Sequence, residues 1–387
     1  DLDGNQYIDM CIMGVGTNIL GYGHPSVDKA VIDAVGSGNM STLNCPEEVF
    51  LAEKLIELNP WANMVRLARS GGEANSIAVR IGRAASGKDG VAFCGYHGWH
   101  DWYLSSNIND DSNLDGHLLP GLNPRGVPRG LAGTAFPFEY NNFNQLCDLI
   151  KNNSIGVIKM EVQRNHAPTD DFLQKVRDLA TANNIVLIFD ECTSGFRQTY
   201  GGLHKAHGVE PDIAMFGKAL GNGYAITAIV GRKAVMEAAQ STFISSTFWT
   251  ERIGPVAALK TLEVMEYEKS WERITTSGLK LKKGFEDLSV SHGLTIEQWG
   301  LPSLAGFTFF SADNLAYKTL ITQEMLKKGY LASNSVYLCI DHSDDLIDKY
   351  LDHLDPIFGL IKECEDGRKV MDLLSGPTCH AGFKRLN

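Results

Sequence analysis

Ile185-Val186-Leu187-Ile188-Phe189-Asp190-Glu191 is an apolar run that ends in two adjacent carboxylates. A short continuous run of this kind predicts a strand that is buried on both faces. In open α/β sheets, ligands bind outside the carboxyl ends of the strands. The run therefore predicts an α/β fold and places Asp190 and Glu191 at a candidate ligand-binding edge.

Similar apolar runs occur on both sides of this one, and amphipathic segments separate them. The runs are Val91–Cys94, Ile155–Met160, Ile213–Phe216 and Ala225–Val230, and Phe172–Asn183 is an amphipathic segment whose apolar positions share one helical face. Short strands that alternate with helices favour a mostly parallel sheet covered on both sides. From about Pro255 the pattern becomes mixed, which predicts a smaller C-terminal α+β domain.

Three of the predicted strands end in residues that can do chemistry. Glu161 follows Ile155–Met160, and Gly217-Lys218 follows Ile213–Phe216, so both join Asp190 on one rim of the sheet. A lysine kept partly neutral can form an imine with an aldehyde. A carboxylate can hold the ring nitrogen of pyridoxal phosphate protonated, so that the ring accepts electrons. This combination indicates a pyridoxal-phosphate site.

A phosphate site is the remaining requirement, and Ser70-Gly71-Gly72-Glu73 meets it. The segment precedes a predicted helix over Glu73–Ala85. Glycine-rich backbone at a helix N-terminus offers free N–H groups and a favourable dipole to an anion. Taken alone, the same segment is more typical of an ordinary turn and helix cap.

With these residues in place, the sequence resembles the class III aminotransferases of pyridoxal-phosphate fold type I, which include glutamate-1-semialdehyde aminomutase. The matching motifs occur in the family's order and span nearly the whole chain. They are Ser70-Gly71-Gly72-Glu73-Ala74, Tyr96-His97-Gly98, Asp190-Glu191-Cys192-Thr193-Ser194-Gly195-Phe196-Arg197, Lys218-Ala219-Leu220-Gly221-Asn222-Gly223 and Ser246-Thr247-Phe248.

The resemblance implies a fold and a set of roles. The expected fold is α/β, with a mostly parallel seven-stranded sheet in the large domain and a smaller C-terminal α+β domain. Lys218 would form the Schiff base and move protons, and Asp190 would hold the pyridinium nitrogen. The other implied cofactor-binding residues are Ser70, Gly71, Gly72, Tyr96, His97, Glu161, Cys192 and, from a partner subunit, Thr247, with Tyr96 stacking on one face of the ring and Cys192 packing under the other.

The sequence departs from the family pattern at several of these positions. Gly72 replaces a hydroxyl residue, so one phosphate hydrogen bond is lost while the backbone donor remains. Cys192 stands where valine is usual, and Trp249-Thr250 stands where the family has Asn-Pro. Trp249 is a candidate substrate residue, as are Arg164 and Arg252, either of which could bind a carboxylate in a bidentate pair.

Composition excludes several other kinds of partner. The formal net charge of -11 and the scattered basic residues argue against nucleic acid, and no run approaches the ~18 apolar residues of a membrane span. His97-Gly98-Trp99-His100 has a metal-like spacing, but it lacks further ligands nearby, so we expect no metal. The eight cysteines form no C-x-x-C pair, which is typical of reduced thiols in the cytoplasm.

The predicted organisation is an N-terminal segment (1–22), a large cofactor-binding domain (23–258) and a small C-terminal domain (259–387). Residues Asp1–Asp9 read as a hairpin with its turn at Asp3-Gly4-Asn5, so we expect a further N-terminal segment before them. The family resemblance implies a homodimer with a shared active site.

The predicted activity is transamination between an amine donor and a ketone or aldehyde acceptor, both small molecules. The segment Lys218–Tyr224 looks more like the transaminase version than the aminomutase version. The alternatives are a 2,1-aminomutase of the glutamate-1-semialdehyde kind, or a non-catalytic protein that keeps the fold. The substrate stays open among amino acids, amino sugars, β-amino acids and simple amines.

Overall fold

The computed structural model describes residues 1–117 and 119–381. The chain forms two compact units. The larger unit contains Tyr22–Tyr267, and the smaller unit combines Asp1–Gly21 with Glu268–Ala381. Each unit has its own sheet and its own apolar core.

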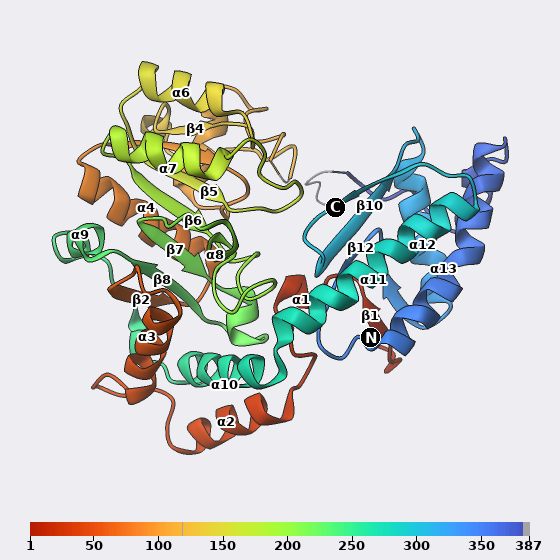
Figure 1. The fold of residues 1–387 in the computed structure, drawn as a ribbon, viewed down its shortest axis with the longest axis horizontal. Helices are drawn as coiled ribbons and strands as arrows, with labels where there is room; N and C mark the ends of the chain where they lie inside the picture. The colour runs from red at the N-terminus through yellow and green to blue at the C-terminus, as the bar shows by residue number, and fades with distance from the viewer. Residues whose placement is uncertain (118, 382–387) are drawn as a thin grey trace. The chain divides into compact units, whose positions relative to one another are not determined.

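The larger unit contains a mostly parallel sheet, as predicted (Figure 1). Within the described residues it has seven strands in the order β2-β8-β7-β6-β5-β3-β4. Only β8 runs antiparallel to its neighbours β2 and β7. The strands are β2 (Met64–Ala68), β3 (Gly90–Cys94), β4 (Ala135–Pro137), β5 (Ile155–Glu161), β6 (Val186–Asp190), β7 (Ile213–Phe216) and β8 (Thr227–Gly231).

Helices cover both faces of this sheet. Helix α4 (Gly71–Ser86) packs on β5, β6 and β7. On the other face, α7 (Phe172–Ala182) packs against β6, with α6 (Phe143–Asn152) beside it (Figure 1). The remaining helices of this part of the chain are α2 (Pro25–Gly36), α3 (Pro46–Leu58), α5 (Asp101–Leu104), α8 (His204–His207), α9 (Lys233–Met236) and α10 (Ile253–Glu268). Short 3₁₀ turns lie at Ser105–Ile108, Arg129–Leu131, Lys218–Gly221, Glu237–Gln240 and Thr247–Thr250.

Strand pairing decides which side chains share a face of the sheet. The register pairs Glu161 with Asp190 and Asp190 with Met215. Because directly paired residues point to the same face, these three side chains lie together. The apolar side chains next to them on β5, β6 and β7 belong to one core cluster with those of α4, so this is the α4 face. The sheet therefore delivers a carboxylate-rich edge next to the N-terminus of α4.

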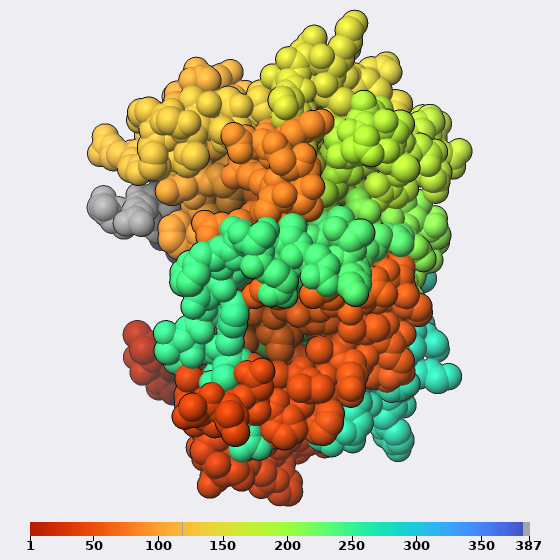
Figure 2. Space-filling view, turned by 90° about the vertical axis from the view of Figure 1, so that its left-hand side faces the viewer, coloured from red at the N-terminus to blue at the C-terminus, as the bar shows by residue number. Residues whose placement is uncertain are grey.

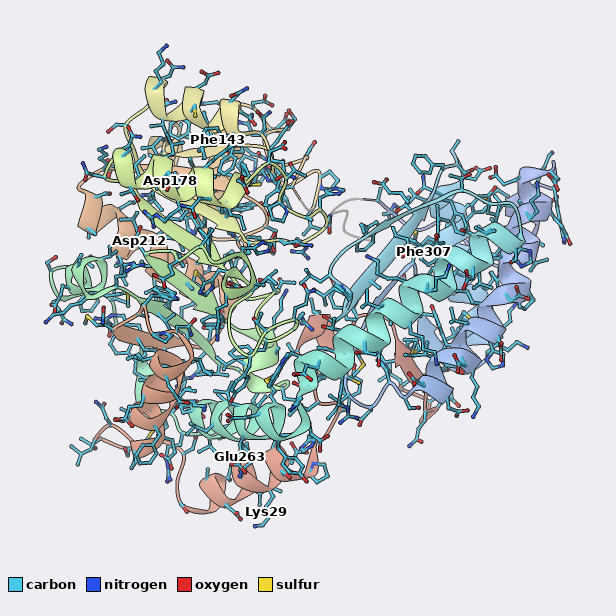
Figure 3. All side chains as sticks on the ribbon, in the orientation of Figure 1. Lys29, Phe143, Asp178, Asp212, Glu263 and Phe307 are labelled. Carbon is cyan, nitrogen blue, oxygen red and sulfur yellow. The ribbon has the colours of Figure 1, made fainter. Side chains whose placement is uncertain are left out.

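The smaller unit is an α+β arrangement. Strands β9 (Ile296–Trp299), β10 (Leu304–Phe309) and β12 (Ser335–Tyr337) form an antiparallel sheet. Phe307 on β10 is fully buried against the rings of Phe285, Phe309 and Phe358 (Figure 3). The helices are α1 (Met13–Gly16), α11 (Ser270–Ser291), α12 (Asn314–Leu326) and α13 (Asp344–Glu365), and a 3₁₀ turn lies at Val370–Asp372.

The predicted N-terminal hairpin is wrong. Gly4 N donates to Asp1 O in a turn, but the strand that follows, β1 (Ile8–Met10), pairs in parallel with β11 (Tyr330–Ala332). The alternation after the turn reflects pairing with a distant strand, which a local pattern cannot identify. Within the described residues, no helix is long and apolar enough to cross a membrane.

Candidate active site

Asp190 is the last residue of β6, and its carboxylate is buried at the α4 face. Oδ2 lies 2.8 Å from His97 Nδ1, and Oδ1 accepts a hydrogen bond of 3.1 Å from the backbone N–H of Cys192. His97 is itself fully buried, and its Nε2 lies 3.0 Å from Cys94 O. A carbonyl can only accept, so Nε2 carries the hydrogen of this bond. The structure thus joins Asp190 to two of the other predicted residues.

Lys159 is a second partner of Asp190, and sequence reasoning missed it. It lies in the middle of β5 with no exposed surface. Its Nζ is 3.6 Å from Asp190 Oδ2 and 3.1 Å from the sulfur of Met215. The available signal was a lysine inside the apolar run Ile155–Met160, because lysine is almost never fully buried unless it is paired.

Burial and charge act in opposite directions on this pair. Burial alone would raise the pKa of Asp190, but the Lys159 ammonium and the His97 hydrogen bond hold it well below its ordinary value. Burial lowers the pKa of Lys159, against the pull of the Asp190 charge. Asp190 is therefore an ionised carboxylate throughout the physiological range.

Lys218 begins the 3₁₀ turn that follows β7, and its backbone φ is +44°. A positive φ is unfavourable for lysine, and residues strained in this way are often found at active sites. Its Nζ donates a 2.8 Å hydrogen bond to Thr193 Oγ1. Burial, followed by the positive charge of Arg164, lowers the pKa of Lys218. A larger fraction of this amine is therefore neutral than in a lysine exposed to water.

The Ser70–Gly72 segment begins α4. Ser70 is the N-cap residue, and its Oγ accepts a 3.4 Å hydrogen bond from Glu73 N. The first N–H groups of a helix have no intrahelical acceptor, so the amides of Gly71 and Gly72 remain available to an anion. Ser70 O accepts a 3.3 Å hydrogen bond from Thr227 Oγ1.

Gly217 connects this turn to the other predicted residues. A Cβ built on Gly217 would lie 2.9 Å from Thr227 Cγ2 and 3.3 Å from Cys192 Sγ. Only glycine fits there without displacing one of these neighbours. Cys192 and Thr227, whose hydroxyl donates to Ser70 O, therefore both lie against the residue that precedes Lys218.

Tyr96 and Cys192, the two predicted ring-contacting residues, both pack against the core under α4. Tyr96 is half-buried and meets Tyr103 edge to face at 5.9 Å. Cys192 is buried, and burial followed by the charge of Asp190 raises the pKa of its thiol well above the ordinary value. Cys192 is therefore an uncharged, compact contact and not a nucleophile.

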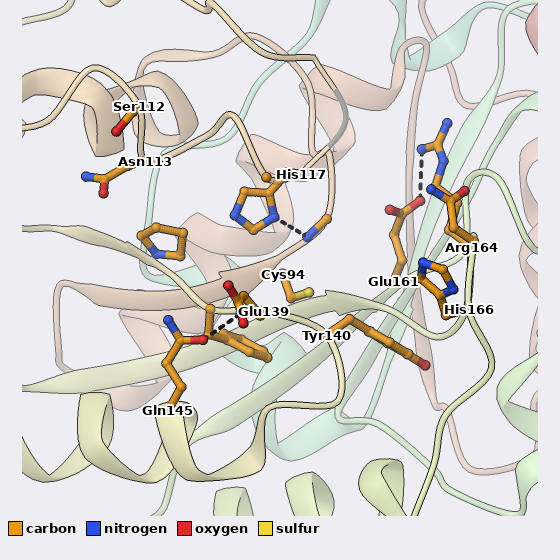
Figure 4. Close-up of a pocket in the computed structure, with 15 residues that line it drawn as sticks. Cys94, Ser112, Asn113, His117, Glu139, Tyr140, Gln145, Glu161, Arg164 and His166 are labelled. Atoms are coloured by element: carbon orange, nitrogen blue, oxygen red, sulfur yellow. Dashed lines mark hydrogen bonds and ion pairs between the residues drawn. The ribbon is translucent and has the colours of Figure 1, made fainter. Parts of the chain in front are cut away.

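Glu161 and Arg164 lie at a pocket of about 500 Å³ (Figure 4). Arg164 Nη1 donates to Glu161 Oε1 at 3.2 Å, and His117, Tyr140 and His166 line other parts of the pocket. Glu161 pairs with Asp190 in the sheet, and the charge of Arg164 acts on Lys218. The pocket is thus next to the carboxylate edge of the sheet.

Thr247, Trp249 and Arg252 belong to residues 241–252, which run beside residues 38–47 (Figure 2). Arg69, the residue before Ser70, donates to Phe248 O at 2.6 Å and to Glu251 O at 3.2 Å, so this segment also lies near the start of α4. Thr247 is exposed. The Trp249 ring lies 5.1 Å from the Arg66 guanidinium, and Arg252 forms a bidentate pair with Glu47 at 2.6 and 3.3 Å. Within the described residues, none of these three side chains is hydrogen-bonded or ion-paired to Asp190 or Lys218.

Within residues 1–117 and 119–381, no group of three or more His, Cys, Asp or Glu side chains is arranged to hold a metal ion.

Comparison with solved structures agrees with this fold. The FumI protein of Sphingopyxis sp. MTA144 superimposes with a TM-score of 0.84 at 23% identity, covering 97% of this chain and 89% of that one. An omega-transaminase from Sphaerobacter thermophilus gives 0.81 at 24% identity, covering 92% and 88%. At these identities, the likeness concerns the fold alone.

Sequence comparison extends the likeness to the family. A 3-aminobutyryl-CoA aminotransferase from Cloacimonas acidaminovorans (strain Evry) is 33% identical over 360 residues, which cover 89% of this chain and 83% of the relative. A glutamate-1-semialdehyde 2,1-aminomutase from Methanococcoides burtonii is 31% identical over 342 residues, with coverages of 86% and 79%. The family model described as "Aminotransferase class-III" matches residues 1–339. The chain therefore belongs to the class III aminotransferase family.

Proposed function

We propose that this protein is a pyridoxal-phosphate-dependent aminotransferase in which Lys218 forms the Schiff base with the cofactor and Asp190 pairs with the cofactor's ring nitrogen. One observation carries this proposal: backbone and side-chain groups of the turn Asp190–Thr193 hydrogen-bond to both the Asp190 carboxylate and the Lys218 amine. Cys192 N donates to Asp190 Oδ1 at 3.1 Å, and Lys218 Nζ donates to Thr193 Oγ1 at 2.8 Å. The turn holds an amine and an ionised carboxylate at the ends of neighbouring strands.

The residues around this turn fit the cofactor in charge and in shape. When bound, pyridoxal phosphate supplies an aldehyde that condenses with amines and a ring that accepts electrons. The Gly71 and Gly72 amides suit its phosphate, and a Cβ on Gly71 would meet no atom within 4 Å, so the approach is open. Tyr96 and Cys192 offer the two apolar contacts that a flat ring requires.

Lys218 can serve both as the attachment point and as the proton carrier. Its lowered pKa favours a neutral amine, which can attack an aldehyde. When a substrate amine takes the place of Lys218, the freed lysine amine can accept a proton. Thr193 Oγ1 orients Nζ in the meantime. Asp190, ionised and buried, favours a proton on the ring nitrogen that it faces.

The substrates we propose are a small amine donor and a ketone or aldehyde acceptor. The relatives that match over most of the chain include both an aminotransferase and an aminomutase, so intramolecular amino transfer is the second candidate. Glu161 and Arg164 at the 500 Å³ pocket are the proposed substrate-side polar pair.

The test of this proposal is a panel of amine donors scored by loss of the Schiff-base absorbance. We expect at least one donor to discharge the absorbance and an added keto acid to restore it. Borohydride should attach the cofactor covalently to the wild type but not to Lys218→Ala. Turnover without any keto acid would support the aminomutase instead. A protein that binds the cofactor through Lys218 but responds to no donor or semialdehyde would be non-catalytic.

We further propose a cytoplasmic homodimer in which Thr247 reaches the phosphate of the neighbouring subunit. Thr247 is exposed, and so are Phe243 (83%) and Phe248 (55%) in the same segment and Leu43 (78%) in the segment that runs beside it. Clustered exposed apolar side chains are typical of an interface. All eight cysteines are free, in keeping with a reducing compartment. Sedimentation should give twice the 42.4 kDa chain mass, and Phe243→Asp should weaken the dimer; a monomeric wild type would refute the shared site.

A further inference from the structure

His100 occupies the space beside Gly72 that a larger residue would fill. A Cβ built on Gly72 would lie 2.6 Å from His100 Cε1 and 2.7 Å from His100 Nδ1. Real Cβ atoms do not approach other atoms so closely, so a side chain at position 72 would require the His100 ring to move. The hydroxyl residue that the family carries at this position is therefore replaced here by an imidazole from another segment.

The His100 ring is held by its own backbone and by its neighbour. His100 is the N-cap residue of α5, and its carbonyl accepts hydrogen bonds from Tyr103 N (2.9 Å) and Leu104 N (3.2 Å). Its ring stacks on that of Trp99 at 4.6 Å. A Cβ on Gly98 would meet Gly72 Cα at 3.0 Å, so the loop packs closely against the start of α4.

The ring nitrogen that faces Gly72 lacks a partner. Nδ1 of His100 is buried and, within the described part of the chain, makes no hydrogen bond. Leaving a buried polar atom unpaired costs about 1–3 kcal/mol, so such an atom beside a candidate binding site is available to a ligand group. The neighbouring amides of Gly71 and Gly72 are donors at a helix N-terminus, which selects an anion for that group.

We propose that His100 Nδ1 donates a hydrogen bond to the phosphate of the bound cofactor, in place of the side-chain hydroxyl that Gly72 lacks. The inference rests on the proposed pyridoxal-phosphate function and deepens it. His100 is a phosphate-binding residue in this view, and the glycine at position 72 leaves room for the imidazole in this position.

The experiment compares pyridoxal phosphate with pyridoxal, which lacks the phosphate, by titration of the cofactor-free protein. His100→Ala should weaken binding of pyridoxal phosphate about tenfold or more, since a hydrogen bond to a charged group is lost. Binding of pyridoxal should change less than about twofold. Equal weakening of both, or no change in either, would overturn the proposal.

Two further variants separate the hydrogen bond from packing. Trp99→Ala removes the stacked ring but keeps Nδ1, so it should weaken binding of pyridoxal phosphate clearly less than His100→Ala does. Adding Gly72→Thr to His100→Ala supplies a hydroxyl in the vacated space and should recover most of the lost affinity. A double variant that binds no more tightly than His100→Ala would count against the proposal.

These outcomes are distinct from failure of the proposed function. If the wild type forms no Schiff base at Lys218 with either compound, the proposed function fails. If it does form one while His100→Ala shows no phosphate-selective loss, only the role of His100 fails. Circular dichroism of the cofactor-free variants checks that each is folded.

Discussion

Asp190 and Glu191 are adjacent carboxylates, both buried and both next to a histidine, yet their surroundings differ. Glu191 has four hydrogen-bond donors: Ser194 Oγ (2.9 Å), Leu203 N (2.6 Å), His204 N (3.0 Å) and His204 Nδ1 (2.6 Å). Asp190 has two close contacts, from His97 and Cys192 N, and one longer contact of 3.6 Å from Lys159.

The difference shows which carboxylate can still bind a ligand. An ionised carboxylate offers about four acceptor sites. All four acceptor sites of Glu191 are occupied by donors from residues 194–204. Glu191 therefore fixes the loop formed by these residues and has no acceptor site left for a ligand. Asp190 keeps acceptor capacity on the face that it shares with Lys218 and the start of α4. We therefore propose a structural role for Glu191 and a chemical role for Asp190, and five predictions test that proposal.

The largest effect should come from removing the two charges separately. Asp190→Asn keeps the shape but loses the negative charge at the ring nitrogen, so the donor half-reaction should slow roughly 100-fold or more, as losses of preorganised electrostatic groups do. Glu191→Gln should slow it less than about threefold per folded molecule. Stopped-flow absorbance measures both, and similar losses for the two variants would erase the proposed distinction.

Stability should show the opposite order for these residues. Glu191→Gln replaces an acceptor of four hydrogen bonds with a group that must turn donors toward donors, so the free energy of unfolding should fall by about 2–4 kcal/mol. Urea unfolding of the cofactor-free protein, followed by circular dichroism, measures this loss. A Glu191→Gln protein as stable as the wild type would contradict the structural role.

Lys159 should couple to Asp190 and not to Glu191. In a double-mutant cycle on the cofactor-free protein, Lys159→Met and Asp190→Asn should show a coupling of about 1–2 kcal/mol. Met215→Leu, which removes only the sulfur contact to Nζ, is the matched control and should show little coupling with Asp190→Asn. No coupling in the first cycle would mean that the buried ammonium does not act on Asp190.

The same pair predicts a pH dependence. The folded pKa of Asp190 is held below the ordinary 3.8, so its contribution to stability is complete well above pH 3.8 and is lost as the pH falls below it. Asp190→Asn should therefore flatten the acid side of the stability curve. An acid limb that Asp190→Asn leaves unchanged would contradict the lowered pKa.

The smallest effect concerns the outer edge of the Glu191 network. Trp61 Nε1 donates to His204 Nε2 at 3.0 Å, which leaves the hydrogen of His204 on the nitrogen that faces Glu191. Trp61→Phe should lower the free energy of unfolding by about 1 kcal/mol and leave the half-reaction rate unchanged. A loss of rate would show that the two carboxylate regions are not independent.

Local sequence patterns identified the central strands but not the edges of the sheet. The runs beginning at Ile155, Ile185 and Ile213 are almost entirely apolar, with Lys159 as the charged exception, because β5, β6 and β7 are covered on both faces. Strand β2 is only half-buried and β4 has three residues, so neither produces a recognisable run. The reversed direction of β8 has no local signal, since an antiparallel strand in the interior of a sheet has the same apolar composition as a parallel one.

The residues of the candidate site also fall into two groups, those that local sequence patterns predicted and those that only the structure identified. Asp190, Lys218 and the glycines at 71 and 72 stand at the ends of periodic segments, where a charge or a glycine is conspicuous, and their motifs together indicated the family. Lys159 and His100 are recognised only through their neighbours, because Asp190 lies 31 positions from Lys159 and Gly72 lies 28 positions from His100.

The sequence by itself therefore determined the class of fold, the order of the central strands along the chain and the chemical groups at their ends. Hydrophobic periodicity and motif spacing are local, and local information is sufficient for those features. The tertiary structure alone decided which carboxylate remains open, which lysine lies behind it and which ring fills the space beside Gly72. Those contacts depend on strand register and on loop packing, which bring distant residues together.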